Sequence, residues 1–252
     1  MNNPPPLSPI KPIEVSERWF PQGRPFGLYE FGGIVAPNVT CILGWKFPFD
    51  KSKWVESEPD IDHDAVTRHS TARGTAVHFA MEQWLQGKPH EPSEDLLPWI
   101  NPLQDLVSQA DKTLAVEIPI HYKIGGVGAY AGSCDGLMLV GGEVVISDYK
   151  TKRPGKRVSP RFCGKQKLQL AAYALAINDI YQDQLPSPVV RTSLLFAHPE
   201  EGKPVTVVST EGDELLEYQQ QWMDILGAWY AEHGDDVAQE QARFQGEKAR
   251  PF

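Results

Sequence analysis

The 252-residue sequence has only three cysteines, which lie far apart and form no C-x-x-C pair. Such a pattern offers no disulfide framework and suits a reducing compartment. No segment approaches the roughly 20 consecutive apolar residues that cross a bilayer. The N-terminus has neither an apolar signal core nor the Arg-rich, amphipathic pattern of a transit peptide. The sequence therefore predicts a cytoplasmic protein with no membrane partner, and we expect a monomer.

Several cofactor and catalytic signatures are also missing. In the stretch GGVGAYAG, Gly126 and Gly128 are followed by Ala131 where the dinucleotide fingerprint requires a glycine. The sequence contains no G-x-x-x-x-G-K-[ST] phosphate loop, no H-x-x-x-H pair and no local signature of a Ser or Cys triad. These absences predict that the protein uses no small-molecule cofactor.

Hydrophobic residues make up 41% of the chain, which is enough for a sizeable core. The Pro- and Gly-rich residues 1–36 are expected to wrap the surface irregularly, as an extension of a single domain over residues 37–252. Apolar periodicity predicts helices at 68–86, 103–110, 168–180 and 214–232, a short apolar turn or helix start at 39–45, and strands at 114–122, 129–140, 143–150, 192–198 and 205–209. This order predicts an α/β (α+β) fold, with helices flanking a mixed central β-sheet.

Charge is unevenly distributed along the chain. The formal net charge is −9, yet the segment from Tyr149 to Asn178 has eight basic residues and no acidic residue. A local basic patch sets the field that a polyanion meets, and an acidic remainder limits non-specific binding. A solvated basic loop would have the same composition, but the clean segregation favours phosphate binding. The residues expected to contact DNA are Lys152, Arg153, Lys156, Arg157, Arg161, Lys165 and Lys167.

In the stretch VVISDYKTKR (residues 144–153), an apolar strand runs directly into an acid, an aromatic residue and a lysine. Asp148 and Lys150 are two residues apart and therefore share a strand face. For an isolated D-x-K motif, an ion pair is a sufficient explanation. The neighbouring Gly141-Gly142 dipeptide, however, predicts a two-residue hairpin turn, because both glycines can adopt positive φ.

A two-residue turn would set the pairing of the two strands. Val140 would face Glu143, so Asp135 would lie directly opposite Asp148, with Cβ atoms about 5 Å apart. Two carboxylates at that distance repel each other, and a bridging divalent cation is the simplest compensation. Oxygen ligands favour Mg²⁺ or Mn²⁺. Lys150 falls on the same face, so the pattern predicts a cluster of two acids and one lysine around a metal.

Four short motifs occur in the order in which they occur in the PD-(D/E)XK nuclease superfamily, and the sequence resembles its RecB-like exonuclease branch. They are GTAVH (Gly74 to His78), GSCD (Gly132 to Asp135), DYK (Asp148 to Lys150) and QLAAY (Gln169 to Tyr173). Together with AVEIPI and PNVTCIL, the pattern is most similar to the mitochondrial genome maintenance exonuclease group and its bacterial and phage relatives. The likeness covers roughly residues 37–197. Iron–sulfur members of the branch have four cluster cysteines, so the three scattered cysteines here imply no iron–sulfur cluster.

The resemblance implies a role for each motif residue. Asp135 and Asp148 would bind the catalytic metal together with the backbone carbonyl of Tyr149. His78 would be a further ligand, although a lone histidine on a helix is more often a packed core residue. Lys150 would orient the attacking water and offset the charge of the transition state.

Three further residues are accessory candidates. Gln169 and Tyr173 share one helix face and could hydrogen-bond the metal shell or a phosphate, although a tyrosine on an Ala/Leu helix is ordinarily part of the core. Glu117, on the first predicted strand, would either support the metal ligands from behind or be an additional acid. Most tryptophans are expected in the core, and those that could stack on bases are Trp45, Trp54 and Trp84.

The resemblance implies a metal-dependent DNA exonuclease that hydrolyses phosphodiester bonds of single-stranded DNA with a free end, in DNA processing, repair or maintenance. The long basic loop 152–164, interrupted by Pro and Gly, is expected to arch over the cleft so that the strand is threaded. The alternatives are an endonuclease or flap nuclease of the same fold, a catalytically silent nucleic-acid-binding subunit, and a small-molecule metal hydrolase. Clustered carboxylates facing an anion argue against the silent subunit, and the basic segment argues against the small-molecule hydrolase.

Overall fold

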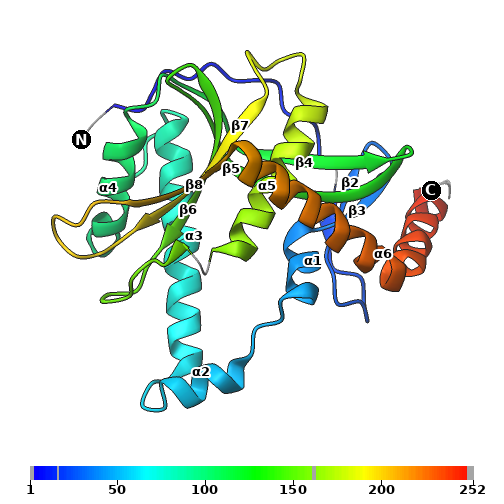
Figure 1. Cartoon of the computed structure of the whole chain (residues 1–252), viewed down its shortest axis with the longest axis horizontal. Coiled ribbons are helices and arrows are strands. Elements are labelled where there is room, and N and C mark those ends of the chain that lie inside the picture. The colour runs from blue at the N-terminus through cyan, green and yellow to red at the C-terminus, as the bar shows by residue number, and fades with distance from the viewer. Residues whose placement is uncertain (1–2, 16, 161–162, 249–252) are drawn as a thin grey trace.

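The computed structural model describes residues 3–15, 17–160 and 163–248, and its centre is a five-stranded sheet (Figure 1). Its strands are β4 (Lys112–Ile124), β5 (Val127–Val140), β6 (Glu143–Thr151), β7 (Val189–Ala197) and β8 (Thr206–Glu211). They lie in the order β4-β5-β6-β7-β8; β6 and β7 run parallel, and the other neighbours are antiparallel. This mixed sheet with flanking helices confirms the predicted fold class.

Helices cover both faces of the sheet. Two helices, α5 (Gly164–Ile180) and α6 (Gly212–Lys248), share one buried hydrophobic cluster with inward-facing strand residues. On the other face, α3 (His63–Leu85) and α4 (Leu97–Val107) form a second cluster with side chains of β5, β6 and β7. A short 3₁₀ helix, η1 (Glu94–Leu96), leads into α4. Burial on both faces explains why the central strands are almost continuously apolar in sequence.

The N-terminal segment is more regular than expected. It forms a small antiparallel sheet of β1 (Glu17–Trp19), β2 (Leu28–Phe31) and β3 (Ile34–Pro37). Gly32 and Gly33 have φ values of 56° and 90° and make the tight turn between β2 and β3. This is the same two-glycine hairpin signal as at 141–142, hidden here by the surrounding prolines. The buried side chains of this small sheet, among them Leu28 and Val35, join the main core.

The long helices begin earlier or end later than periodicity predicted. Helix α3 starts at His63 because the Asp62 side chain accepts the N–H of Ala65 and caps the helix. Helix α4 starts at Leu97, since a proline in the first turn is tolerated. None of the helices in the described ranges is long and apolar enough to cross a membrane.

Two short helices precede α3. Helix α1 (Val39–Lys46) is capped by Asn38 and packs into the core, whereas α2 (Lys51–Ser57) has no buried residue. Residues 47–62, which we call the arm, carry α2 away from the sheet and return the chain to α3 (Figure 1). The sequence did not predict α2, because a seven-residue helix without an apolar side has no periodic signal.

Candidate active site where β5 and β6 separate

The β5–β6 hairpin has the predicted register as far as the site. Gly141 and Gly142 have φ values of 60° and 82°, and the pairs run from Val140–Glu143 to Gly136–Ser147. The next pair in this register would be Asp135 with Asp148, and the pairing ends before it. The two strands separate here because the Asp135 carboxylate accepts the backbone N–H of Tyr149 at 2.9 Å. The direct opposition of the two acids is therefore replaced by a contact from side chain to backbone.

Helix α3 brings His78 against this junction. His78 Nδ1 lies 3.2 Å from Asp135 Oδ2, and Nε2 lies 2.6 Å from the Tyr149 carbonyl oxygen. The Tyr149 ring is buried and lies edge-on to the imidazole, so it packs beside the site and does not face solvent. Burial by itself would lower the pKa of His78, but the hydrogen bond and the charge of Asp135 raise it to about 9. At neutral pH, His78 is therefore a cation that holds two oxygen groups together.

The third member of this group is Glu117 of β4. Ligand atoms of His78, Glu117 and Asp135 all lie within 4.8 Å of one another. Ser133 Oγ donates a hydrogen bond to Glu117 Oε2 at 3.1 Å. Burial, and then the charge of Asp135, raise the pKa of Glu117. One imidazole, two carboxylates and the nearby Tyr149 carbonyl are a donor set that suits a divalent cation with nitrogen and oxygen ligands.

The backbone of Glu117 is strained. Its φ of 49° makes it the one non-glycine residue in the described ranges with a positive φ. It lies between the pairs Val116–Gly136 and Ile118–Cys134, and so faces Asp135 across the ladder. A non-glycine residue with this backbone conformation destabilises the fold by about 1–3 kcal/mol. Such a conformation persists where the surrounding structure imposes it, commonly at functional sites. This strain favours an active-site role for Glu117.

Asp148 and Lys150 form a second group beside the first. Asp148 is buried, and its Oδ2 lies 2.5 Å from Lys150 Nζ. Burial, aided by the charge of Asp135 and opposed by Lys150, raises the pKa of Asp148 to about 6. Burial alone would lower the pKa of Lys150, but Asp148 and then Asp135 raise it. Lys150 is therefore a cation held against an acid that ionises near neutral pH.

Residues of the GSCD and QLAAY motifs pack against each other. Gln169 Nε2 donates to Tyr173 Oη at 3.1 Å, and the Tyr173 ring is buried under β5. A Cβ atom at Gly132 would lie 2.9 Å from that ring, so the glycine of GSCD admits the tyrosine of QLAAY. Burial also raises the pKa of Tyr173 well above its usual range. These residues support the strand that bears Asp135 from the face covered by α5.

The basic residues expected to contact DNA have different surroundings. Lys167 is buried and pairs with Glu214 at 2.6 Å. It therefore fastens α5 to α6, which differs from the DNA contact expected from sequence. Arg157 is exposed, and Arg161 lies outside the described residues. Lys152 lies over the Phe196 ring, 5.3 Å from its centroid.

Three of the basic residues are tied to the arm. Arg153 and Lys156 both pair with Glu58, the first at 3.1 Å, and Lys165 Nζ donates to the Phe47 carbonyl at 3.2 Å. The described part of the loop after β6 is therefore joined to residues about 100 positions earlier in the chain, a contact that the expected arch over the cleft did not include. Among the three tryptophans, Trp54 lies on the arm, Trp84 is partly buried against the hydrophobic cluster of α3, α4 and the sheet, and Trp45 Nε1 donates to Glu232.

The sequence reasoning missed Arg73. It lies on α3, five residues before His78, and its Nε donates to Thr151 Oγ1 at 3.4 Å. Its guanidinium also covers the Trp99 ring, 4.9 Å from the centroid. The one signal in the sequence was its position immediately before Gly74 of the GTAVH motif, and a single arginine on a helix forms no pattern by itself.

Comparison with known proteins assigns the chain to a class of enzymes. The family model of the PD-(D/E)XK nuclease superfamily matches residues 107–249, which is more than half of the chain. The protein therefore belongs to the PD-(D/E)XK nuclease superfamily. The matched region contains Glu117, Asp135, Asp148 and Lys150, and His78 precedes it.

Two solved structures have a distant likeness to the chain. One, "Crystal structure of SSO0001", has 13% sequence identity and a TM-score of 0.37, with 75% of this chain and 74% of the other covered. A second, from Eubacterium rectale and named "putative exonuclease", has 10% identity and a TM-score of 0.43, with coverages of 72% and 69%. At these TM-scores neither likeness bears on function. No curated protein matches the chain.

His78→Ala is expected to weaken Mn²⁺ binding about tenfold or more and to flatten its pH dependence between pH 7 and 9. The His78 pKa of about 9 means that coordination must displace a proton, so affinity in the wild type rises with pH up to that value. Asp148, with a pKa of about 6, is already ionised across this window. Titration calorimetry at several pH values measures both effects. A collapse of thermal stability with unchanged metal binding per folded molecule would show a core histidine instead.

Proposed function

We propose that this protein is a metal-dependent DNA exonuclease of the RecB-like branch that acts on single-stranded DNA with a free end, in DNA processing, repair or maintenance. The observation that carries the proposal is the convergence of His78, Glu117 and Asp135 beside the Asp148–Lys150 pair, in a chain of this superfamily. Acids without a basic neighbour would serve metal binding alone, whereas the lysine supplies a positive charge that stabilises the transition state of phosphodiester hydrolysis.

The metal ligands in this proposal are His78, Glu117, Asp135 and the Tyr149 carbonyl, with Asp148 as a further candidate beside them. Their nitrogen and oxygen atoms suit Mg²⁺ or Mn²⁺. A divalent cation bound there would polarise a phosphoryl oxygen and lower the pKa of a bound water. The strained backbone of Glu117 and the hydrogen bond from Tyr149 N–H fix the two carboxylates before any ion arrives.

Lys150 provides the positive charge for the chemical step. Its ammonium is held by Asp148 Oδ2, so it is oriented before the substrate binds. Negative charge grows on the phosphoryl oxygens as water attacks in line, and a fixed ammonium nearby stabilises this charge more than it stabilises the ground state. Asp148 also keeps Lys150 protonated, as the raised pKa of the lysine shows.

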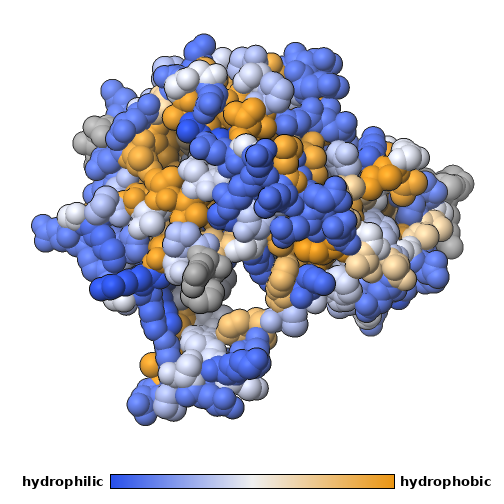
Figure 2. Space-filling model, in the orientation of Figure 1, coloured by the Kyte–Doolittle hydropathy of each residue, from blue (hydrophilic) through white to orange (hydrophobic). Residues whose placement is uncertain are grey.

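The preference for a free single-stranded end is supported by the arm. Both of its ends are covalently joined to helices that pack on the body of the protein, α1 and α3. Figure 2 shows an opening between the arm and the body. A single strand that passes through this opening would contact the basic loop that follows Lys150. The phosphates of the strand would then lie next to the cationic side chains of the loop.

The test of the proposed function uses one end-labelled oligonucleotide as a single strand and as a duplex. Each is incubated with Mg²⁺, Mn²⁺ or EDTA, and the products are resolved by length. We expect metal-dependent shortening from an end of the single strand, with mononucleotides or short oligonucleotides as products. Discrete internal fragments at early times would instead favour the endonuclease or flap-nuclease alternative. No cleavage with either metal would contradict the proposal.

Lys156→Glu combined with Arg157→Glu is expected to weaken single-strand binding and to reduce its salt dependence. Removing one cation that neutralises a phosphate lowers the slope of log K against log salt by about 0.7 for a single strand. Fluorescence anisotropy of a labelled oligonucleotide in EDTA measures this slope. The control reverses two exposed lysines elsewhere, Lys88 and Lys123, and so applies the same change in net charge. Equal slopes in the two double variants would place the strand elsewhere.

A further inference from the structure

Positive charge exceeds negative charge at the end of β6. Arg153 and Lys156 share the single carboxylate of Glu58. Arg73 stands beside them, and in the described part of the chain it has no acidic side chain within ion-pair distance. Burial, and then electrostatic repulsion from the charge of Arg153, lower the pKa of Arg73. The two guanidinium groups are therefore close enough to repel each other. Three neighbouring cations therefore have one carboxylate among them, and that carboxylate pairs only with Arg153 and Lys156.

These cations border the candidate active site. Arg153 follows Lys150 by three residues, and Arg73 is on the helix that carries His78. Arg73 also donates to Thr151, the last residue of β6. A strand whose scissile phosphate lies near Lys150 would therefore bring a neighbouring phosphate towards the three cations.

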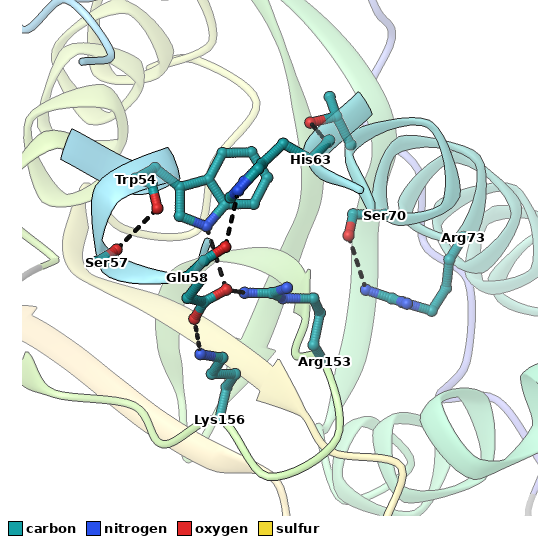
Figure 3. Close-up of polar contacts among 9 residues, drawn as sticks. Trp54, Ser57, Glu58, His63, Ser70, Arg73, Arg153 and Lys156 are labelled. Carbon is teal, nitrogen blue, oxygen red and sulfur yellow. Dashed lines mark hydrogen bonds and ion pairs between the residues drawn. The ribbon is translucent and has the colours of Figure 1, made fainter. Parts of the chain in front are cut away.

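Glu58, the carboxylate that pairs with Arg153 and Lys156, belongs to the arm. Figure 3 shows Arg153 and Lys156 reaching Glu58 from the loop, with Trp54 Nε1 donating to the same carboxylate at 3.3 Å. The backbone carbonyl of Glu58 is held separately by His63 Nε2 at 2.9 Å. Because α2 has no buried residue, the Glu58 side chain can rotate away without disturbing the core.

Aromatic rings adjoin the same place. The Arg153 guanidinium lies 5.8 Å from the centre of the Trp54 ring, and Phe49 is edge-on to Trp54 with 5.7 Å between ring centres. Phe49 is 72% exposed, so a large apolar ring faces solvent beside a cluster of cations. This is the combination that holds single-stranded nucleic acid, in which the nucleobases stack on rings and the phosphates meet cationic side chains.

We propose that Arg73, Arg153 and Lys156 form a second phosphate-binding site for the single strand, that Glu58 occupies it when no DNA is bound, and that the adjoining base stacks on Phe49 and Trp54. A phosphodiester can replace the carboxylate because both are anions with two oxygens for the guanidinium fork. The proposal rests on the proposed function, since it names how that substrate is held next to the active site.

Glu58→Gln is expected to tighten the binding of a fluorescein-labelled 20-nucleotide oligo(dT) about fivefold in EDTA. The reason is that the variant lacks the carboxylate that competes with DNA for the cations. The slope of log K against log salt should also become steeper by about 0.7, since the vacated cations hold counterions that DNA then releases. Arg153→Gln should do the opposite, with weaker binding and a shallower slope. Phe49→Ala should weaken binding without changing the slope.

The matched control is Glu143→Gln, which breaks the Glu143–Arg191 ion pair at the opposite end of β6. That pair has an N–O distance of 3.2 Å, against 3.1 Å for Arg153–Glu58. Its removal should leave DNA binding unchanged. If Glu58→Gln binds more weakly than the wild type, or matches Glu143→Gln, then Glu58 only holds the arm in place and the proposal is wrong. Thermal melts confirm that every variant compared is folded.

The same oligonucleotide with Mn²⁺ separates this proposal from the proposed function. Cleavage by the wild type without tighter binding by Glu58→Gln would refute the second phosphate site and leave the nuclease function standing. Tighter binding by Glu58→Gln with no cleavage by the wild type would refute the nuclease function and support the site as a single-strand binding site.

Discussion

Lys150→Ala is expected to slow DNA cleavage about a hundredfold or more at saturating metal, with the fold retained. The variant removes a fixed positive charge from the place where negative charge grows during hydrolysis, and the loss of one such group typically has an effect of this size. The ammonium is held 2.5 Å from Asp148 Oδ2, so its charge is fixed in position before the substrate binds. Single-turnover cleavage of an end-labelled oligonucleotide measures the chemical step without product release.

Asp148→Asn should give the same loss of activity but a different effect on stability. The folded-state pKa of Asp148 is about 6, above the value of about 3.9 for an unfolded chain. Folding therefore favours the protonated acid, and its stabilising contribution is lost as pH rises through 6. The neutral amide avoids this loss but leaves the buried Lys150 ammonium without its acid, so Asp148→Asn should melt closer to the wild-type temperature at pH 7.5 than at pH 4.

Lys203→Ala is the control for the lysine. It removes a half-buried lysine that also contacts an acid, Glu200, and it should leave the cleavage rate unchanged. Wild-type cleavage by a folded Lys150→Ala protein would contradict the assignment of the site. Loss of folding in Lys150→Ala is tested by the same melts, and Lys150→Met, which keeps the length of the side chain, then provides the comparison.

The sequence predicted the parts of the site that depend on local rules. The Gly141-Gly142 turn is confirmed, because two adjacent glycines select one turn type whatever surrounds them. That turn sets the register up to Gly136–Ser147. The position of Asp148 and Lys150 on one strand face follows from the alternation of a strand, whereas their direct ion pair is the simpler alternative for a D-x-K motif. These features need information from only about ten residues of sequence.

The rest of the site depends on contacts that no local pattern encodes. Glu117 acquires its role through a left-handed backbone, which period-two alternation does not anticipate. The hairpin register predicts that Asp135 pairs directly with Asp148. The Asp135 carboxylate instead accepts the backbone N–H of Tyr149, so the ladder ends one pair earlier. The sequence shows the charge of Lys167 and so predicts a DNA contact, whereas its burial beside Glu214 depends on how α5 packs against α6.

The arm shows the same limit most clearly. Helix α2 has no apolar face, and Glu58 meets Arg153 across a separation of 95 residues. Composition located the basic segment, but it could not show that an acid from another part of the chain already occupies two of its cations. Only the fold brings the short helix α2 and the basic loop together beside Lys150.

A closed circular single strand is expected to survive under conditions in which its linear form is consumed. The arm leaves the body at α1 and returns at α3, and both helices pack on the core. The opening seen in Figure 2 is therefore bounded by continuous chain, which a strand can pass only by its end. Opening this boundary would require α1 or α3 to unpack, whereas rotation of Glu58 leaves it closed.

The measurement compares equal amounts of an oligonucleotide and its ligated circle, at the same length and metal concentration, on one denaturing gel. Glu58→Gln should keep the difference between the two substrates, because the boundary is covalent and does not depend on that ion pair. Cutting one bond in the circle should restore the linear rate, which excludes an effect of sequence or length. Comparable degradation of circle and linear strand would show that DNA does not thread under the arm, and would move the assignment to an endonuclease of the same fold.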